Sequence, residues 1–584
     1  MSKKHKNSKT VNLYTDTENP LVTPFEEDGE SWESIYPRQL LKRDSYFPLA
    51  KGWHLIVKRE GECIYDGGIN MPYPPESRIS GVGVGIDEKS LGEYTVSFTL
   101  PDGFNKGRVL LHIGAVDNEC TILLNGERVG ENKGGYNPID CDITGALKEG
   151  ENLLTVLVRD SLSPDMPYGK QRKKRKGMWY TPVSGIWQSV WLESVIEGCI
   201  ESIKTVADTK SVSIVCKGGR AEKTLTLHCD QGERIYEFCG DRLDLEIENG
   251  RLWSPEDPYL YYFDITDGYD KVSSYFALRS MDVRPVGEHM RICLNGKPYF
   301  LHALLDQGYY SDGIFLPASP RGYLWDILKI KELGFNTLRK HIKVEPDLFY
   351  YYCDKYGMIV FQDMVNNGKY SFFLDTALPT VGIKGQLVRG RVTKKQKESF
   401  IKCCEQTLDI LHNHPSVCLY TVFNEGWGQF EAGKVYKHLK SLDPTRLYDS
   451  ASGWFTEKES DFDSEHIYFR KLRLKAGSER PLILSEFGGY SYSVKGHCFN
   501  EENEYGYRSF KDRKSYGDAI DQLYFEQVIP HISKGLCAAV LTQVSDVEDE
   551  TNGLVTYDRQ VVKVDTHRMK RISDAISDAM KKEI

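Results

Sequence analysis

The chain has 584 residues, which is too long for a single hydrophobic core, so two to four domains are expected. Apolar residues make up 40% of the chain and charged residues 27%, the ordinary balance of a soluble globular protein. The formal net charge of -9 gives no support to a nucleic-acid partner.

The N-terminal residues 1–40 are polar and lack a regular hydrophobic period, so we expect an extended or partly ordered arm. No apolar segment of a signal peptide is visible there, and no run of about 18 apolar residues occurs in the chain, so no membrane span is expected. The 14 cysteines are scattered and include no C-x-x-C pair. We therefore predict a cytoplasmic protein with free thiols.

Residues 41–195 are predicted to form a jelly-roll β-sandwich. Short apolar stretches such as 92–100 and 152–160 alternate with turns rich in Gly, Pro, Asn and Asp. Asn125-Gly126, placed between two alternating segments, is a strong local signal for a hairpin. Many short strands separated by such turns are typical of sandwiches of this kind.

Residues 196–284 are predicted to form a second, smaller sandwich of the immunoglobulin-like kind. Strand-like stretches continue at 211–217, 223–230 and 259–266, and a length of roughly 90 residues suits that fold. Segment 251–258 contains two prolines, which would interrupt a central strand. We therefore expect it at an edge or in a turn.

Residues 285–584 are predicted to form a (β/α)8 TIM barrel, because short apolar runs now alternate with longer helical patterns. The candidate strands are 297–305, 335–342, 358–364, 417–425, 446–453, 463–469, 481–488 and 537–545. In this fold the chemistry takes place at the C-terminal ends of the strands.

Two glutamates, Glu425 and Glu486, end the fourth and seventh candidate strands, so both are expected at the same mouth of the barrel. Two carboxyl groups that face one cleft suit glycosidic bond cleavage, in which one is protonated and the other ionised. A separation of roughly 5 Å would give retention of configuration. The structural alternative is that each glutamate only takes part in an ion pair.

A family resemblance adds to this interpretation. The stretches FNEGWG (423–428) and LSEFGG (484–489) resemble the acid/base and nucleophile motifs of glycoside hydrolase family two, which includes β-galactosidases, β-glucuronidases and β-mannosidases. Segments 185–193, 251–261 and 332–346 resemble, in the expected order, motifs of its jelly roll, its immunoglobulin-like domain and its second barrel strand. The resemblance covers nearly the whole chain from about residue 38.

The resemblance implies a retaining, exo-acting β-glycosidase that forms a covalent glycosyl-enzyme, with Glu425 as acid/base and Glu486 as nucleophile. A β-galactosidase is the default expectation. The alternatives with the same mechanism are a β-glucuronidase, β-galacturonidase, β-mannosidase or arabinopyranosidase, and a different class is a non-catalytic carbohydrate-binding protein on the same fold. The expected partner is a glycoside, with no cofactor, and a homo-oligomer is compatible with all of this.

The same resemblance assigns roles to residues around the two glutamates. Asn424 would bind the sugar 2-hydroxyl, Arg339 would hold the nucleophile ionised, and Tyr468 would orient it. His466 lies on the same strand face as Tyr468. It could contact the substrate or be a core histidine.

Other strand ends supply further candidates for substrate binding. These are His341, Asp363, Trp427, Trp454, Asp306, Gln307 and Gln543. The histidine and the two tryptophans are expected as subsite walls. Asp363 could instead cap a helix, and Asp306 could stabilise a turn. Gln543 stands where many relatives have a Trp, so its role is left open.

The sequence departs from the family pattern at the site for acidic sugars. β-Glucuronidases hold the substrate carboxylate with an Asn-x-Lys pair beyond the eighth strand, and residues 553–563 contain no such pair. Asn-Gly-Lys occurs at 367–369, but after the third strand. Acidic sugars are therefore disfavoured, with Arg559 as the cation that could hold them. The large galactosidases of the family carry extra C-terminal β-domains and bound magnesium, for which we see no counterpart, so no metal is expected.

Residues 169–177, GKQRKKRKG, form the densest basic stretch of the chain. A nuclear-localisation or polyanion-binding role is one interpretation. The favoured interpretation is a solvated loop of the sandwich that reaches toward the barrel mouth.

Overall fold

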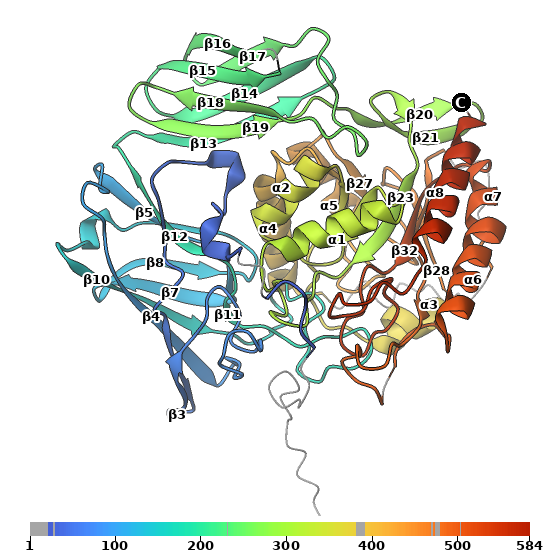
Figure 1. The fold of residues 1–584 in the computed structure, drawn as a ribbon, viewed down its shortest axis with the longest axis horizontal. Helices are drawn as coiled ribbons and strands as arrows, with labels where there is room; N and C mark the ends of the chain where they lie inside the picture. Colours follow the sequence, from blue (N-terminus) through green and yellow to red (C-terminus); the bar gives the residue numbers. More distant parts are fainter. Residues whose placement is uncertain are drawn as a thin grey trace, which may run out of the picture.

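The computed structural model of the chain describes residues 21–26, 30–230, 232–380, 392–468, 471–473, 479–502 and 504–583. Two β-sandwiches border a larger α/β barrel, one to its left and the other above in Figure 1. Most of the expected N-terminal arm lies outside the described residues. The described residues of the arm are 21–26 and 30–40, and two short 3-10 helices, η1 (Trp32–Ser34) and η2 (Gln39–Leu41), lie at its end. The indole of Trp32 donates to the carbonyl of Pro317 at 3.3 Å, so this part packs on the barrel.

The N-terminal sandwich consists of two antiparallel sheets whose alternating apolar residues face each other. The larger sheet has the order β3-β2-β4-β10-β7-β8, with strands β2 (His54–Arg59), β3 (Glu62–Gly68), β4 (Ser90–Thr99), β7 (Glu119–Leu124), β8 (Glu127–Lys133) and β10 (Glu151–Arg159). The smaller has the order β1-β12-β5-β9, with β1 (Tyr46–Pro48), β5 (Arg108–Ile113), β9 (Ile139–Asp142) and β12 (Val190–Val195). The predicted hairpin is confirmed, because Asn125 and Gly126 join β7 to β8 with φ of 54° and 86°.

The second sandwich is also confirmed and lies above the first in Figure 1. One sheet contains β13 (Ile200–Ala207), β14 (Ser211–Gly218) and β17 (Arg242–Glu246), and the other contains β15 (Glu222–Cys229), β16 (Gly232–Cys239), β18 (Tyr261–Thr266) and β19 (Lys271–Phe276). Pro255 and Pro258 lie in the irregular segment before β18, as expected. A hairpin of β20 (Met281–Val286) and β21 (His289–Leu294) then leads to the barrel. Arg291 of this hairpin donates to the carbonyl of Leu536, at the start of the last barrel strand, at 3.1 Å.

The barrel contains eight parallel strands in the order β27-β26-β25-β24-β23-β32-β29-β28. They are β23 (Leu301–Asp306), β24 (Thr337–Lys340), β25 (Ile359–Asp363), β26 (Val417–Thr421), β27 (Leu447–Asp449), β28 (Asp463–Ile467), β29 (Leu482–Gly488) and β32 (Leu536–Thr542). Each coincides with one of the eight predicted apolar runs. Among the described residues no ladder joins β27 to β28, so the sheet curls into a nearly closed barrel.

Helices cover the outside of the barrel (Figure 1). They include α1 (Arg321–Glu332), α2 (Asp347–Tyr356), α4 (Lys394–Leu411), α5 (Ala432–Leu442), α6 (Arg513–Leu523) and α8 (Thr566–Lys581). Helix α4 begins with a capping box, in which the Thr393 side chain accepts from the backbone of Gln396 and the Gln396 side chain accepts from Thr393. None of the described helices has the length and apolar character that crossing a membrane requires.

Candidate active site

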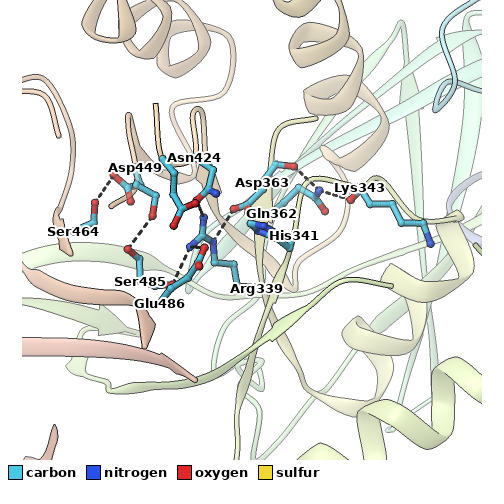
Figure 2. Close-up of polar contacts among 12 residues, drawn as sticks. Arg339, His341, Lys343, Gln362, Asp363, Asn424, Asp449, Ser464, Ser485 and Glu486 are labelled. Carbon is cyan, nitrogen blue, oxygen red and sulfur yellow. Dashed lines mark hydrogen bonds and ion pairs between the residues drawn. The ribbon is translucent and has the colours of Figure 1, made fainter. Parts of the chain in front are cut away.

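Arg339, at the end of β24, connects the polar groups at the mouth of the barrel. Its side chain is fully buried. The guanidinium donates to Asp363 Oδ1 at 2.9 Å, to Glu486 Oε1 at 3.1 Å and to Asn424 Oδ1 at 2.9 Å. Figure 2 shows Arg339 between these three residues, which come from three different strand ends. Burial lowers the pKa of the guanidinium, but the two carboxylates outweigh this effect and hold it above its usual range. Arg339 is therefore a permanent cation.

Glu486 lies within β29, and each of its carboxylate oxygens has a donor. Arg339 contacts Oε1, and the hydroxyl of Tyr468 donates to Oε2. Burial would raise the pKa of Glu486, but electrostatic interactions with His466 and Arg339 oppose it and hold that pKa below its usual range. Glu486 is therefore ionised at neutral pH.

Glu425 follows β26 in a sharp turn rather than ending the strand itself. Its φ is 54° and that of Gly426 is 78°, both in the left-handed region. The backbone N–H of Glu425 donates to the carbonyl of Ser452 at 3.1 Å, which ties this turn to the segment after β27. The Glu425 side chain meets His466, whose Nδ1 lies 2.7 Å from Oε1. The turn thus directs the Glu425 carboxyl group across the mouth.

The two glutamates come together at the mouth of the barrel. One oxygen of Glu425, one of Glu486 and a ring nitrogen of His466 all lie within 4.8 Å of one another. Such a group has spacing that a metal ion could use, but Glu486 already accepts from Arg339 and Tyr468. Two carboxyl groups about 5 Å apart, one held ionised by a cation, are the arrangement that retaining glycoside cleavage requires.

Comparisons with known proteins agree with this geometry. The sequence profile described as "Glycosyl hydrolases family 2, sugar binding domain" matches residues 65–195, and the one described as "Glycosyl hydrolases family 2, TIM barrel domain" matches residues 319–572. The chain belongs to glycosyl hydrolase family 2.

Two solved structures share the fold across most of the chain. The β-D-glucuronidase of Dictyoglomus thermophilum is 18% identical, with a TM-score of 0.73, and the alignment covers 92% of this chain and 98% of that one. The β-galacturonidase of Eisenbergiella tayi, bound to galacturonate, is 16% identical with a TM-score of 0.66 and covers 94% and 99%.

The curated relatives with similar sequences are longer than this chain. A "Beta-galactosidase" of Clostridium acetobutylicum is 23% identical over 424 residues, which is 68% of this chain and 44% of that protein. The chain spans less than half the length of the first curated relatives that it matches.

The predicted residue Asp363 holds two other predicted residues in place. Its Oδ1 accepts from Arg339, and its Oδ2 lies 2.7 Å from Nδ1 of His341. Asp363 is 1% exposed, and the residues that follow it form no helix, so the helix-cap alternative is wrong. Burial lowers the pKa of His341, although Asp363 opposes this, so the ring is neutral at neutral pH.

The two predicted aromatic walls are mostly covered. Trp427 is 3% exposed and packs edge-on against Trp179, with ring centroids 5.1 Å apart. Its indole donates to the carbonyl of Gly368 at 3.1 Å. Trp454 is 7% exposed, with its ring 6.1 Å from that of His466. The tryptophans border the glutamate pair, and their role as subsite walls stays a prediction.

The remaining predicted residues form two buried groups. Asp306 pairs with Lys340 at 2.7 Å and accepts the backbone N–H of Gly308 at 2.9 Å, which includes the turn contact considered as an alternative. Gln307 donates to Gln543 at 2.8 Å. Gln543 in turn begins a chain of hydrogen bonds that continues through Asn552 to Glu550.

Arg559 does not have a free guanidinium, contrary to the expectation that it could hold an acidic sugar. It is ion-paired with Asp326 at 3.1 Å and donates to the carbonyls of Tyr309 and Tyr557 at 3.0 and 2.9 Å. The pair at 367–369 is also not a cation site in the barrel, because Asn367 donates to the carbonyl of Gln396 and Lys369 is exposed.

Several site residues were missed from the sequence. Ser452 Oγ lies 3.0 Å from Nε2 of His466 and donates to Ser485 at 2.8 Å. Tyr507 stacks on Tyr468 with centroids 3.8 Å apart. Asp449, at the end of β27, accepts from Ser464 at 3.2 Å, and burial raises its pKa to about 6. Asp449 is an acidic residue inside the predicted strand 446–453, a signal we could have used, whereas Tyr507 lies in an irregular segment with none.

Proposed function

We propose that the chain is a retaining, exo-acting β-glycosidase with Glu425 as acid/base and Glu486 as nucleophile. The observation that carries this proposal is the proximity of the two carboxyl groups, within 4.8 Å, with Arg339 and Tyr468 both on Glu486. Family 2 membership supports the chemistry. Because the chain spans less than half of its first curated relatives, its activity is inferred from the site rather than transferred from them.

In the first step, Glu486 attacks the anomeric carbon while Glu425 gives its proton to the departing glycosidic oxygen. A bond forms between the sugar and Glu486, and the bond to the leaving group breaks. In the second step, Glu425 takes a proton from water, the water oxygen attacks the same carbon, and the bond to Glu486 breaks. His466, 2.7 Å from Glu425 and 3.6 Å from Glu486, is placed to position both carboxyl groups.

Asn424 is proposed to bind the sugar 2-hydroxyl. Its side-chain oxygen accepts from Arg339, so its amide N–H groups remain as donors on the other side. A hydrogen bond to this hydroxyl strengthens in the transition state, which makes it useful for catalysis rather than for binding alone. Asp363 and His341 are proposed to support Arg339 from behind.

The more specific part of the proposal is the identity of the sugar that the enzyme releases. A β-galactoside is the reference substrate, and β-glucuronide, β-galacturonide, β-mannoside and arabinopyranoside are the alternatives. Curated relatives carry the names β-galactosidase and β-glucuronidase at comparable identity, 23% and 24%. We also propose that the domains span 41–195, 196–284 and 285–584. A cytoplasmic location and a homo-oligomer are further proposals.

Replacement of the nucleophile tests this proposal. Glu486→Gln should lower kcat/KM by roughly 10⁴-fold or more, because no covalent intermediate can form. Glu526→Gln, at an exposed position in the helical segment before β32, should leave turnover unchanged. A 2-deoxy-2-fluoro β-glycoside should add its sugar mass to the wild-type peptide that contains Glu486. Unchanged turnover in Glu486→Gln, or a label on another residue, would reject the assignment, and binding without any turnover would favour the non-catalytic class.

A further inference from the structure

A loop of the N-terminal sandwich crosses to the barrel and lies against the candidate site. The backbone N–H groups of Tyr168 and Gly169 both donate to the carbonyl of Asn366, after β25, at 3.1 and 3.2 Å. Gly169 has φ of 65°, and a Cβ atom there would lie 2.8 Å from the carbonyl oxygen of Ile342, after β24. The two backbones are therefore in direct contact, and residue 170 is delivered to the barrel mouth.

Lys170 is held in this position on both sides. Its carbonyl accepts the N–H of Tyr180 at 3.0 Å, and the hydroxyl of Tyr180 donates to Glu550 in the loop after β32. Its ammonium lies 5.7 Å from the centroid of Trp179, whose ring packs on Trp427, two residues after Glu425. Lys170 thus reaches the mouth between the loops that follow strands β24 and β32.

The charge of Lys170 acts on groups of both loops. Burial lowers the pKa of His341, and the ammonium of Lys170 lowers it further. Burial raises the pKa of Glu550, which Lys170 opposes. The ammonium therefore acts on His341, which contacts Asp363, and Asp363 in turn holds the Arg339 that contacts Glu486.

Other cations of the mouth have partners. Arg339 pairs with Asp363 and Glu486, Lys340 with Asp306 and Glu345, Lys343 with Glu345, Arg559 with Asp326, and Lys563 with Asp546. Lys170 is 8% exposed, yet in the described part of the chain no acceptor hydrogen-bonds its ammonium and no carboxylate pairs with it. The residue as a whole is more than nine-tenths covered and its ammonium has no carboxylate partner among the described residues, so its charge is poorly compensated. A negative group supplied from outside would compensate it.

We propose that Lys170 is a specificity-determining residue that binds a carboxylate on the substrate's sugar, so that the preferred substrate is a β-linked uronide. This inference rests on the proposed glycosidase function. A lysine of the N-terminal sandwich would here take the place of the Asn-x-Lys pair that residues 553–563, after the eighth strand, do not contain. A compact ammonium suits a carboxylate attached to a sugar ring, because an ammonium can bind it without a fixed planar geometry.

Matched substrates test the role of Lys170. We expect the full-length wild-type chain to cleave 4-nitrophenyl β-D-galacturonide or β-D-glucuronide with a higher kcat/KM than the corresponding galactoside or glucoside. Lys170→Met should lower kcat/KM for the uronide about 10- to 100-fold, the value of a charge-assisted hydrogen bond, and change the neutral glycoside by less than about threefold. Lys170→Arg should restore part of the uronide activity. Lys174→Met, an exposed lysine of the same loop, is the matched control.

Thermal unfolding separates this role from a structural one. If Lys170 serves the ligand, Lys170→Met should not lower the melting temperature, because the charge that is removed has no carboxylate partner among the described residues of the free protein. If it only offsets the charge of Glu550, the variant should be less stable. The free uronic acid should raise the melting temperature of the wild type more than the neutral sugar does, and Lys170→Met should abolish the difference.

Three outcomes overturn the proposal: a wild-type preference for the neutral glycoside, an equal loss of both activities in Lys170→Met, or a lowered melting temperature with an unchanged substrate ratio. Failure of the glycosidase function itself would look different. No glycoside would then be cleaved and Glu486 would not be labelled, while the binding of free uronic acid would still test Lys170.

Discussion

Residue roles at the mouth follow from one cation and its partners. Arg339 fixes the orientation of Asn424, holds Glu486 ionised and is itself held by Asp363. The sequence allowed the two glutamates to be chosen because each closes a buried apolar run. It did not allow the contacts of Lys170 or Tyr507 to be predicted, because both lie in loops whose partners are distant in the sequence.

Tyr468→Phe tests the ionisation of the nucleophile. The tyrosine hydroxyl donates to Glu486 and helps, after His466 and Arg339, to hold the pKa of that carboxyl low. A folded-state pKa below the usual carboxyl value places the acid limb of kcat/KM below about pH 4. Loss of the hydroxyl should raise the pKa and move this limb to higher pH. Tyr356→Phe, at the opposite end of the barrel, should leave the profile unchanged.

If the acid limb of kcat/KM lies at the same pH in Tyr468→Phe and in the wild type, the hydroxyl does not act on the ionisation of Glu486. A fall in kcat that is equal at all pH values would instead assign Tyr468 a purely positional role. The full pH profile of kcat/KM, measured with one chromogenic glycoside, distinguishes the two.

The positions of the barrel strands could be predicted because short apolar runs alternate regularly with helical patterns in this part of the sequence. All eight barrel strands and the Asn125-Gly126 hairpin match the sequence pattern. The exact turn after β26 was not predictable, because Glu425 lies four residues beyond the end of the strand at Thr421, in a left-handed conformation that the apolar run does not signal. The local hydrophobic period determines where the strands lie. The conformation of the turns that hold the catalytic residues depends on contacts between residues distant in the sequence.

Gly169→Ala tests the contact between the two domains at the level of the loop. A methyl group there would meet the Ile342 carbonyl at 2.8 Å and would impose a φ of 65° on an alanine. Strain of about 1–3 kcal/mol should shift the loop away from the barrel. We expect a lower melting temperature, faster proteolysis at the basic residues 172–176, and a uronide activity reduced as in Lys170→Met. Gly145→Ala, where a Cβ atom would meet open space, is the control, and equal behaviour of both variants would refute the contact.

The whole molecule joins its domains through buried polar links rather than through apolar surface alone. Glu193, on β12 of the N-terminal sandwich, is fully buried and connects to the arm. It accepts two hydrogen bonds from Arg38, at 2.9 and 3.0 Å, and one from the hydroxyl of Tyr36. Burial would raise the pKa of Glu193, but Arg38 and His112 outweigh it and hold that pKa well below its usual range. The arm is thus anchored by a carboxylate that must be ionised.

Glu193→Gln should loosen this anchor in a pH-dependent way. Removing one partner of a buried ion pair costs about 3–5 kcal/mol, so the first thermal transition at about pH 7 should fall in temperature. A carboxyl whose folded-state pKa is depressed contributes its full stabilisation above its unfolded pKa, about 4.3, and loses it as the pH falls further. The difference between wild type and variant should therefore narrow below about pH 4. A difference that stays constant down to pH 2, or an equal effect of Glu62→Gln on the exposed strand β3, would show that the ionised state of Glu193 does not stabilise the arm.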